Sequence, residues 1–277
     1  MLHRIREVFT FQMKSISQRI VAIFLLVFLF TLSNMLAIGD FADAMGLRAA
    51  PWGFPHLVND WLCMLVIMAG AAALFCDAPF RSELQIYILP RAGQTAWTLG
   101  HMLYILVLSF LFVLMLLIAS IIPFLTRLDL QLGWGKIWGT LARSFLGSEY
   151  GVQFQISDYL IGVYKPLEAT LYSFLLTWVC CVWLGMLTYL VNTLTGNYVG
   201  TFLASGFVLM DLTIANEWLP WFYRISPVTM AQLHTLKQTG RSIYGVTPLY
   251  AACFFSITIL CFMAGTFLTG KRNCINQ

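Results

Sequence analysis

Long apolar runs separated by short polar segments dominate the chain. Six of these runs approach or exceed the length of about 20 residues that a helix needs to cross a bilayer, and they lie at 20–38, 57–76, 99–125, 169–191, 198–214 and 248–268. The fifth run is short and contains Asp211, but an even number of spans is needed to bring both charged ends of the chain to one side. The pattern predicts an all-α polytopic membrane protein with six transmembrane helices in a single domain, 1–277.

Composition leads to the same class of protein. Apolar residues make up 60% of the sequence and charged residues 10%, so a water-soluble globule of this chain would expose an aggregating surface. The net charge of +4 is small and the basic residues are scattered, unlike the basic patch of a nucleic-acid-binding protein. We therefore expect membrane lipid, and no nucleic acid, as a partner.

Basic residues set the expected orientation. The segment 1–19 contains Arg4, Arg6, Lys14 and Arg19, and Lys and Arg are enriched on the cytoplasmic side of membrane proteins. Six spans then place both termini in the cytoplasm. Within 1–19, apolar side chains recur at helical spacing opposite the basic ones, which predicts an interfacial helix on the inner membrane surface.

The cytoplasmic segment 77–97 has the signals of a short capped helix. Asp77 can cap the helix, and Pro79 suits its first turn. An apolar face is formed by Phe80, Leu84 and Ile88, and Pro90 with Gly93 ends the helix. Such a rod can dock its apolar face in the groove of a partner and transmit force. Alternatively, it only connects two spans.

The external segment 126–168 is long for a connection between helices, which usually marks function or a structure of its own. It contains the apolar face of an amphipathic helix, formed by Trp134, Trp138, Leu141, Ala142 and Phe145. We expect this helix to rest on the outer leaflet. The segment either recognises a substrate or partner, or anchors the protein to the membrane surface.

The second external segment, 215–247, contains Trp218 and Trp221, which suit a membrane–water interface. Ser226 is expected to cap a second helix that has Pro227 in its first turn and runs to about Lys237. The segment is either a helical pair that enters the outer leaflet and returns, or an ordinary surface hairpin.

Polar and small residues in the spans allow two interpretations each. Asp211, like Asn59 and Asp60, lies near the outer end of its run, so we interpret it as an interface residue rather than a pore-lining one. In the fifth span, small residues repeat at intervals of four, at Gly196, Gly200 and Ala204. They would let this helix approach another closely, either between two protomers or within one chain.

No catalytic pattern is present in the sequence. Residues 265–272, GTFLTGKR, nearly match a phosphate-binding P-loop, but Arg272 replaces the required Ser or Thr and no strand precedes the motif. The four histidines are isolated from other metal-ligating side chains, and there is no GxSxG motif. We therefore expect no catalytic, cofactor-binding or metal site in this chain.

Two stretches resemble the ABC type-2 permease family, the membrane subunits of ATP-driven exporters. In that family an acidic residue, an apolar turn, a proline or basic break and a glycine lead into the third span, and a Ser-Pro pair follows the fifth. The corresponding stretches here are ELQIYILPR followed by WTLGH, and LPW followed by ISPVT, at 83–91, 97–101, 219–221 and 225–229. The architectural resemblance covers the whole chain.

The resemblance implies a permease in the bacterial cytoplasmic membrane that pairs with a second copy or a paralogue. A separate P-loop ATPase subunit would bind ATP and Mg²⁺ and grip a coupling helix at 80–89, with contacts at Phe80, Arg81, Glu83, Leu84, Tyr87, Ile88 and Arg91. An outer re-entrant pair at 216–239 would include Trp218, Pro220, Trp221, Ser226 and Pro227. The cargo would be a lipid, polysaccharide, drug or antimicrobial peptide.

The chain departs from the family at 126–168, where a short connection is usual, and at His101, where a lysine is common. The long segment leaves the cargo unassigned. A secondary transporter is the alternative from another class, but the sequence shows no internal repeat and little midplane charge. A membrane sensor or immunity protein that acts by binding alone is the other alternative.

Overall fold

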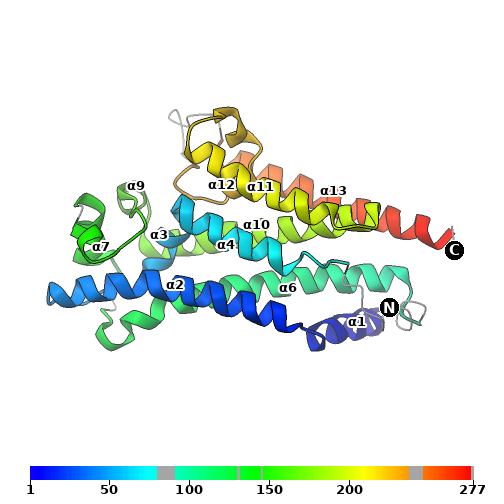
Figure 1. The fold of residues 1–277 in the computed structure, drawn as a ribbon, viewed down its shortest axis with the longest axis horizontal. Coiled ribbons are helices and arrows are strands. Elements are labelled where there is room, and N and C mark those ends of the chain that lie inside the picture. The colour runs from blue at the N-terminus through cyan, green and yellow to red at the C-terminus, as the bar shows by residue number, and fades with distance from the viewer. Residues whose placement is uncertain (80–90, 130–131, 145, 237–245, 276–277) are drawn as a thin grey trace.

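The computed structural model describes residues 1–79, 91–129, 132–144, 146–236 and 246–275 (Figure 1). These residues form helices joined by irregular segments, with an isolated parallel bridge between Ala49 and Leu128. The elements are α1 (Leu2–Lys14), α2 (Gln18–Ala44), α3 (Gly53–Asn59), α4 (Trp61–Leu74), α6 (Gln94–Ile121), η1 (Ile122–Arg127), α7 (Gly135–Arg143), α8 (Leu146–Glu149), α9 (Asp158–Val163), α10 (Pro166–Thr195), α11 (Val199–Ala215), η2 (Pro220–Arg224), α12 (Pro227–Met230) and α13 (Pro248–Ile275).

Four stretches of helix in the described ranges are long and apolar enough to cross a membrane: Gln18–Ala44, Gln94–Thr126, Pro166–Thr195 and Pro248–Thr269. The pair α3 and α4 makes a fifth if it is counted as one span, although its two helices meet at 84°. The predicted fifth span coincides with α11, an apolar helix of 17 residues. The prediction of an all-helical chain with several membrane-spanning lengths is therefore confirmed, with four or five candidate spans among the described residues.

The long helices lie side by side, with α10 at the centre of the bundle (Figure 1). α10 packs against α3, α4, α6, α11 and α13. In its most apolar stretch 61% of the residues are buried, against 28% for α2 and 17% for α13. The apolar surface that is left open to lipid therefore lies mainly on α2 and α13.

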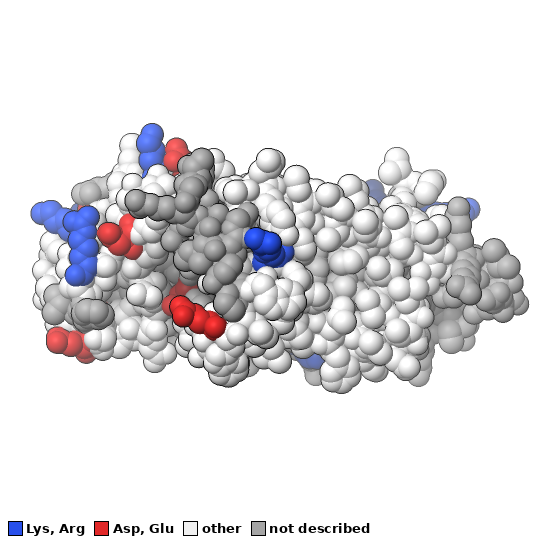
Figure 2. All heavy atoms as spheres, turned by 90° about the horizontal axis from the view of Figure 1, so that it is seen from above, with Lys and Arg blue, Asp and Glu red and all other residues white. Residues whose placement is uncertain are grey.

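Charged side chains are distributed unevenly along the long axis. On the face shown in Figure 2, the acidic residues lie toward the end that carries α7 and α9 in Figure 1, and much of the remaining surface is uncharged. We call this end the α7 end, and the opposite end, which carries α1 and the start of α6, the α1 end. An uncharged band beside a polar end is the surface that a bilayer requires.

The second predicted span, 57–76, is not one continuous helix. Asp60 ends α3 and caps α4, because its Oδ2 accepts hydrogen bonds from Leu62 N at 3.1 Å and Cys63 N at 3.0 Å. Its Oδ1 accepts from Gln155 N at 3.1 Å. Capping by a short acidic side chain satisfies N–H groups that a helix start leaves free, so the chain bends here instead of continuing.

Asn59 and Asp60 are buried inside the protein, at 5% and 7% exposure, and the interpretation of them as interface residues is wrong. Asn59 Nδ2 donates to Pro55 O at 2.6 Å and to Ser173 Oγ at 3.1 Å. Its Oδ1 accepts from the backbone N–H of His234 at 2.9 Å. The Asn59 side chain thus joins α3, α10 and the segment after α12.

The predicted N-terminal helix is present as α1, and part of its apolar face covers protein. α1 packs against α6, and Val8 in its centre is fully buried. Gly100 of α6 permits this close approach, since a Cβ there would lie 2.5 Å from Val8 Cγ1. The chain then turns at Ser15–Ser17 and enters α2, where Ser17 Oγ accepts from Ile20 N at 3.4 Å.

Gly100→Ala is expected to destabilise the protein by about 1–3 kcal/mol, because the new methyl group overpacks the contact with Val8. Val8→Ala removes the opposing side chain. The Gly100→Ala, Val8→Ala double variant should therefore be less destabilised than the sum of the two single variants. Thermal unfolding of the three variants in one detergent measures this coupling. Strict additivity would contradict the docking of α1 on α6.

The amphipathic helix expected in 126–168 is present as α7, but the prediction that it rests on the outer leaflet is wrong for its tryptophans. Trp138 is fully buried, and its Nε1 donates to Ala50 O at 2.9 Å. Trp134 is 8% exposed, and its Nε1 donates to Tyr164 O at 3.0 Å. Each indole N–H finds a carbonyl inside the fold, so the apolar face of α7 points toward protein. Phe145 lies outside the described residues.

The second external segment has the predicted cap but not the predicted helix. Ser226 Oγ accepts from Thr229 N at 3.3 Å, and Pro227 is the first residue of α12. However, α12 ends at Met230 instead of near Lys237. The preceding tryptophans remain accessible, with Trp218 at 68% and Trp221 at 54% exposure.

Asp211 fixes α12 to α11. Its Oδ1 accepts from Thr229 Oγ1 at 2.7 Å and its Oδ2 from Gln232 Nε2 at 3.3 Å. The residue is only 2% exposed, so its interpretation as an interface residue is wrong. A buried carboxylate needs hydrogen-bond donors, and α12 and the turn after it each supply one to Asp211.

Candidate functional site

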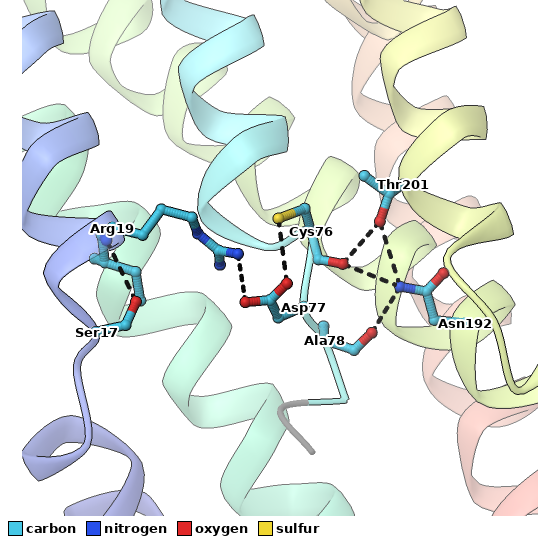
Figure 3. A network of polar contacts seen from close by, with 8 residues as sticks. Ser17, Arg19, Cys76, Asp77, Ala78, Asn192 and Thr201 are labelled. Carbon is cyan, nitrogen blue, oxygen red and sulfur yellow. Dashed lines mark hydrogen bonds and ion pairs between the residues drawn. The ribbon is translucent and has the colours of Figure 1, made fainter. Parts of the chain in front are cut away.

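A polar cluster lies at the α1 end, where the chain leaves α4 beside the turn between α10 and α11 (Figure 3). Its centre is Asn192 of α10, which is 2% exposed. Asn192 Nδ2 donates to Ala78 O at 2.6 Å and lies 3.5 Å from Cys76 O. Asn192 Oδ1 accepts from Gly200 N at 2.7 Å. One side chain therefore joins α10, α11 and the segment that follows α4.

The segment 76–78 is also held by two further side chains. Thr201 Oγ1 of α11 donates to Cys76 O at 2.8 Å. On the other side, Asp77, the expected helix cap, forms an ion pair with Arg19 of α2 (Figure 3). The two charged side chains are 38% and 46% exposed, so their pairing contributes little to stability and mainly sets position. We use the name Asn192 cluster for the six residues Arg19, Cys76, Asp77, Ala78, Asn192 and Thr201.

The Asn192 cluster holds the chain immediately before the predicted coupling residues. Phe80, Arg81, Glu83, Leu84, Tyr87 and Ile88 lie outside the described residues. Arg91 is described and is exposed. The structure therefore describes both flanks of the predicted coupling helix, and the flank at 76–78 is tied to three helices of the bundle.

The three small residues predicted to form one contact surface have different positions. Gly196 is the C-cap of α10, in the left-handed conformation at φ 69° that favours glycine. Gly200 faces α10, since a Cβ there would lie 2.7 Å from Thr188 O. Ala204 is fully buried. For Gly200, close approach is thus a contact within one chain.

A cavity of about 390 Å³ adjoins the cluster. Its floor is buried and is formed by Gln12, Ile20, Ala78, Trp97, Tyr104 and Asn192. Its rim includes the exposed residues Ser15, Ser17, Asn197 and Tyr198. The Arg19–Asp77 ion pair lines the cavity as well. α1, α2, α6, α10 and the segment after α4 therefore share one polar hollow.

His101 is not isolated in the fold, although no residue near it in the sequence indicates a partner. Its ring is fully buried between Trp97, at 4.9 Å, and Tyr189, at 5.1 Å between ring centroids. The Gln12 amide of α1 hydrogen-bonds to His101 Nδ1. This polar contact lies next to the cavity floor and adds to the docking of α1 on α6.

Most of the Asn192 cluster has no signal in the sequence. An asparagine near the end of an apolar run is a readable signal, because a buried amide requires partners. Its main partner, Ala78 O, lies 114 residues earlier, and no local pattern indicates that pairing. Within the described ranges, no group of three or more His, Cys, Asp or Glu side chains could hold a metal ion. The Asn192 cluster can hold neighbouring backbone segments in place through hydrogen bonds.

Comparison with known proteins adds nothing to these observations. No protein-family model, curated protein or solved structure matches the chain. A function must therefore be argued from the residues of this chain and from their geometry.

Proposed function

We propose that this chain is the permease subunit of an ATP-driven exporter of the ABC type-2 kind, and that a separate P-loop ATPase drives it. In this proposal α2, the α3–α4 pair, α6, α10, α11 and α13 are the six spans. The α1 end is cytoplasmic, so both termini lie in the cytoplasm. A second copy or a paralogue completes the path for a lipid, polysaccharide, drug or antimicrobial peptide.

The observation that carries the proposal is the anchoring of 76–78 by Asn192. The segment that leads to the predicted coupling helix is held by side chains of the bundle. Here Asn192 and Thr201 hold the carbonyls of Ala78 and Cys76 at 2.6 and 2.8 Å. Hydrogen bonds to buried groups are costly to leave unmade, so displacement of this segment would be resisted by α10 and α11.

This anchoring suggests how force would reach the spans. An ATPase that moves the predicted coupling helix would pull on 76–78, and the hydrogen bonds would pass that movement to the α10–α11 turn. The Arg19–Asp77 ion pair would pass it to the start of α2. Rigid helices tied to one moving element are the ordinary means of gating by rigid-body motion.

The outer part of the proposal rests on the α7 end. Asn59 of α3, Asp60 at the start of α4 and Asp211 of α11 accept hydrogen bonds from His234 N, Gln155 N and Thr229 Oγ1 of the segments proposed to be external. The outer segment 216–236, with Trp218 and Trp221 toward the leaflet, would then move together with the spans. We extend the proposal to this segment because its tryptophans are exposed and suit an interface.

The test is affinity purification of the tagged chain in a mild detergent from cells that contain its native partners. We expect a P-loop ATPase to co-purify and to hydrolyse ATP. Leu84→Asp with Ile88→Asp should remove the ATPase, because two charges would replace the apolar face expected to enter its groove. Ser82→Asp adds a charge to the opposite face of the same predicted helix and should leave co-purification intact.

Other outcomes would contradict the proposal. Recovery of the chain alone, without hydrolysis in several gentle detergents, would favour a secondary transporter or a membrane sensor. Equal loss of the ATPase in the Ser82→Asp control and in the double variant would overturn the assignment of the docking face.

A further inference from the structure

The cavity beside the Asn192 cluster contains opposite charges with unused hydrogen-bonding capacity. Among the described residues that line it, Arg19 is a cation and Asp77 an anion, and the two pair with each other. Gln12, on the floor, is 4% exposed. Within the described part of the chain, neither Gln12 Oε1 nor Arg19 Nε has a hydrogen-bond partner, although both atoms are buried. A native fold rarely leaves buried polar atoms unpaired, so both side chains keep hydrogen-bonding capacity for a ligand that enters the cavity.

The lining groups define the chemistry of that ligand. The guanidinium of Arg19, whose side chain is 38% exposed, offers N–H donors and a positive charge, so it suits an anionic oxygen. Gln12 Oε1 offers an acceptor in the same cavity as the Asp77 carboxylate, and together they suit an N–H group with positive charge. The indole of Trp97 and the ring of Tyr104 line the same floor and favour a cation nearby.

We infer that this cavity binds the headgroup of a zwitterionic phospholipid with a primary ammonium, the phosphatidylethanolamine class. The phosphate would lie against Arg19 and the ammonium against Asp77 and Gln12. A zwitterion in this orientation runs antiparallel to the protein's own ion pair, so each charge meets its opposite. The cavity of about 390 Å³ falls within the size of small-molecule sites, about 300–1,000 Å³.

The position of the cavity favours a lipid over a soluble ligand. It lies where α2 and α6 begin and α10 ends, the depth at which hydrocarbon gives way to headgroups. Tyr198 on its rim leads directly into an exposed apolar stripe on α11, formed by Val199, Phe202 and Leu209 at 46%, 77% and 56% exposure. Acyl chains can lie along this stripe while the headgroup occupies the hollow.

Lipid binding here would stabilise the anchored segment. The ligand would contact Asp77, which stands next to the Asn192-bound carbonyls of Cys76 and Ala78. It would also contact Gln12 of α1 and Arg19 of α2. A bound headgroup therefore ties the N-terminal helix to the segment before the predicted coupling helix, and this inference stands whether or not an ATPase is the partner.

The test uses the full chain, stripped of lipid in detergent and incubated with equal amounts of phosphatidylethanolamine, phosphatidylglycerol and phosphatidylcholine carrying the same acyl chains. Native mass spectrometry gives the retained lipids. We expect phosphatidylethanolamine to be retained about tenfold more than phosphatidylglycerol, which lacks the ammonium. Phosphatidylcholine should also be retained less, because its quaternary nitrogen cannot donate to Gln12 Oε1.

Two variants separate the contacts. Asp77→Asn leaves Arg19 unpaired, so retention should shift to the anionic phosphatidylglycerol. Gln12→Met removes the acceptor at similar size and should weaken phosphatidylethanolamine retention about fivefold with no gain for phosphatidylglycerol. Glu7→Gln removes an exposed carboxylate of α1 outside the cavity and serves as the matched control, with the wild-type preference expected.

Three results would overturn the inference. The first is equal retention of phosphatidylethanolamine and phosphatidylglycerol by the wild-type chain. The second is an unchanged preference in both Asp77→Asn and Gln12→Met, with gel filtration showing that at least one of them is folded. The third is displacement of the lipid by free phosphoethanolamine at equal concentration, which would indicate a soluble ligand.

Discussion

Gly200→Ala should be one of the most damaging single-methyl additions in this chain. The new Cβ would lie 2.7 Å from Thr188 O and 2.8 Å from Asn192 Oδ1. The first of these atoms belongs to the α10 backbone and cannot rotate away. Relief requires α11 to move outward, which also stretches the Gly200 N to Asn192 Oδ1 hydrogen bond of 2.7 Å. Overpacking and the loss of that bond together predict a destabilisation of about 2–5 kcal/mol.

Gly206 in the same helix provides the matched control. A Cβ at Gly206 would meet nothing within 4 Å, and alanine favours a helix over glycine by about 1 kcal/mol. Thermal unfolding in one detergent should therefore show a clear fall in midpoint for Gly200→Ala and an unchanged or raised midpoint for Gly206→Ala. Equal midpoints for the two variants would show that α10 and α11 do not approach as closely as described.

Asn192→Leu is expected to have an effect of similar size by a different route. Leucine has the same number and branching of side-chain heavy atoms but can neither donate to Ala78 O nor accept from Gly200 N. Each of these backbone groups would remain buried without its partner, at about 1–3 kcal/mol apiece. Besides a lower midpoint, we expect faster labelling of the Cys76 thiol by a maleimide, because the segment 76–78 would lose its main attachment.

Peptide mass spectrometry can report labelling at Cys76 separately from the other cysteines. Asn197→Leu makes the same chemical change at an exposed position on the adjacent turn, so its labelling rate and midpoint should match the wild type. A wild-type labelling rate at Cys76 in Asn192→Leu would mean that Thr201 and Arg19 suffice to hold the segment.

Local patterns in the sequence predicted the elements well. The apolar runs mark α2, α6, α10, α11 and α13 to within seven residues at either end, because burial in lipid requires a long apolar helix regardless of its neighbours. The Ser226-Pro227 pair marks the start of α12, since a cap satisfies N–H groups of its own helix. Both signals depend only on residues near one another in the chain.

Pairings between distant residues were not predictable in this way. Trp138 lies on the expected apolar face of α7, but its N–H partner is Ala50 O, 88 residues earlier. Asp60 interrupts a run that hydropathy alone reads as continuous, and one of its partners is Gln155 N, 95 residues later. Asn192 behaves likewise. Hydropathy measures affinity for lipid and carries no information about which buried polar groups satisfy each other.

The bend at Asp60 has a consequence for the assembly of the protein in the membrane. α4 has 14 residues, about 21 Å of helix at 1.5 Å per residue, while the hydrocarbon core is about 30 Å thick. Its capped start and the bent α3 must be sheltered by protein, and much of that shelter comes from α10 and α11, which are synthesised far later. Insertion of α4 should therefore be completed only after α10 and α11 have left the ribosome.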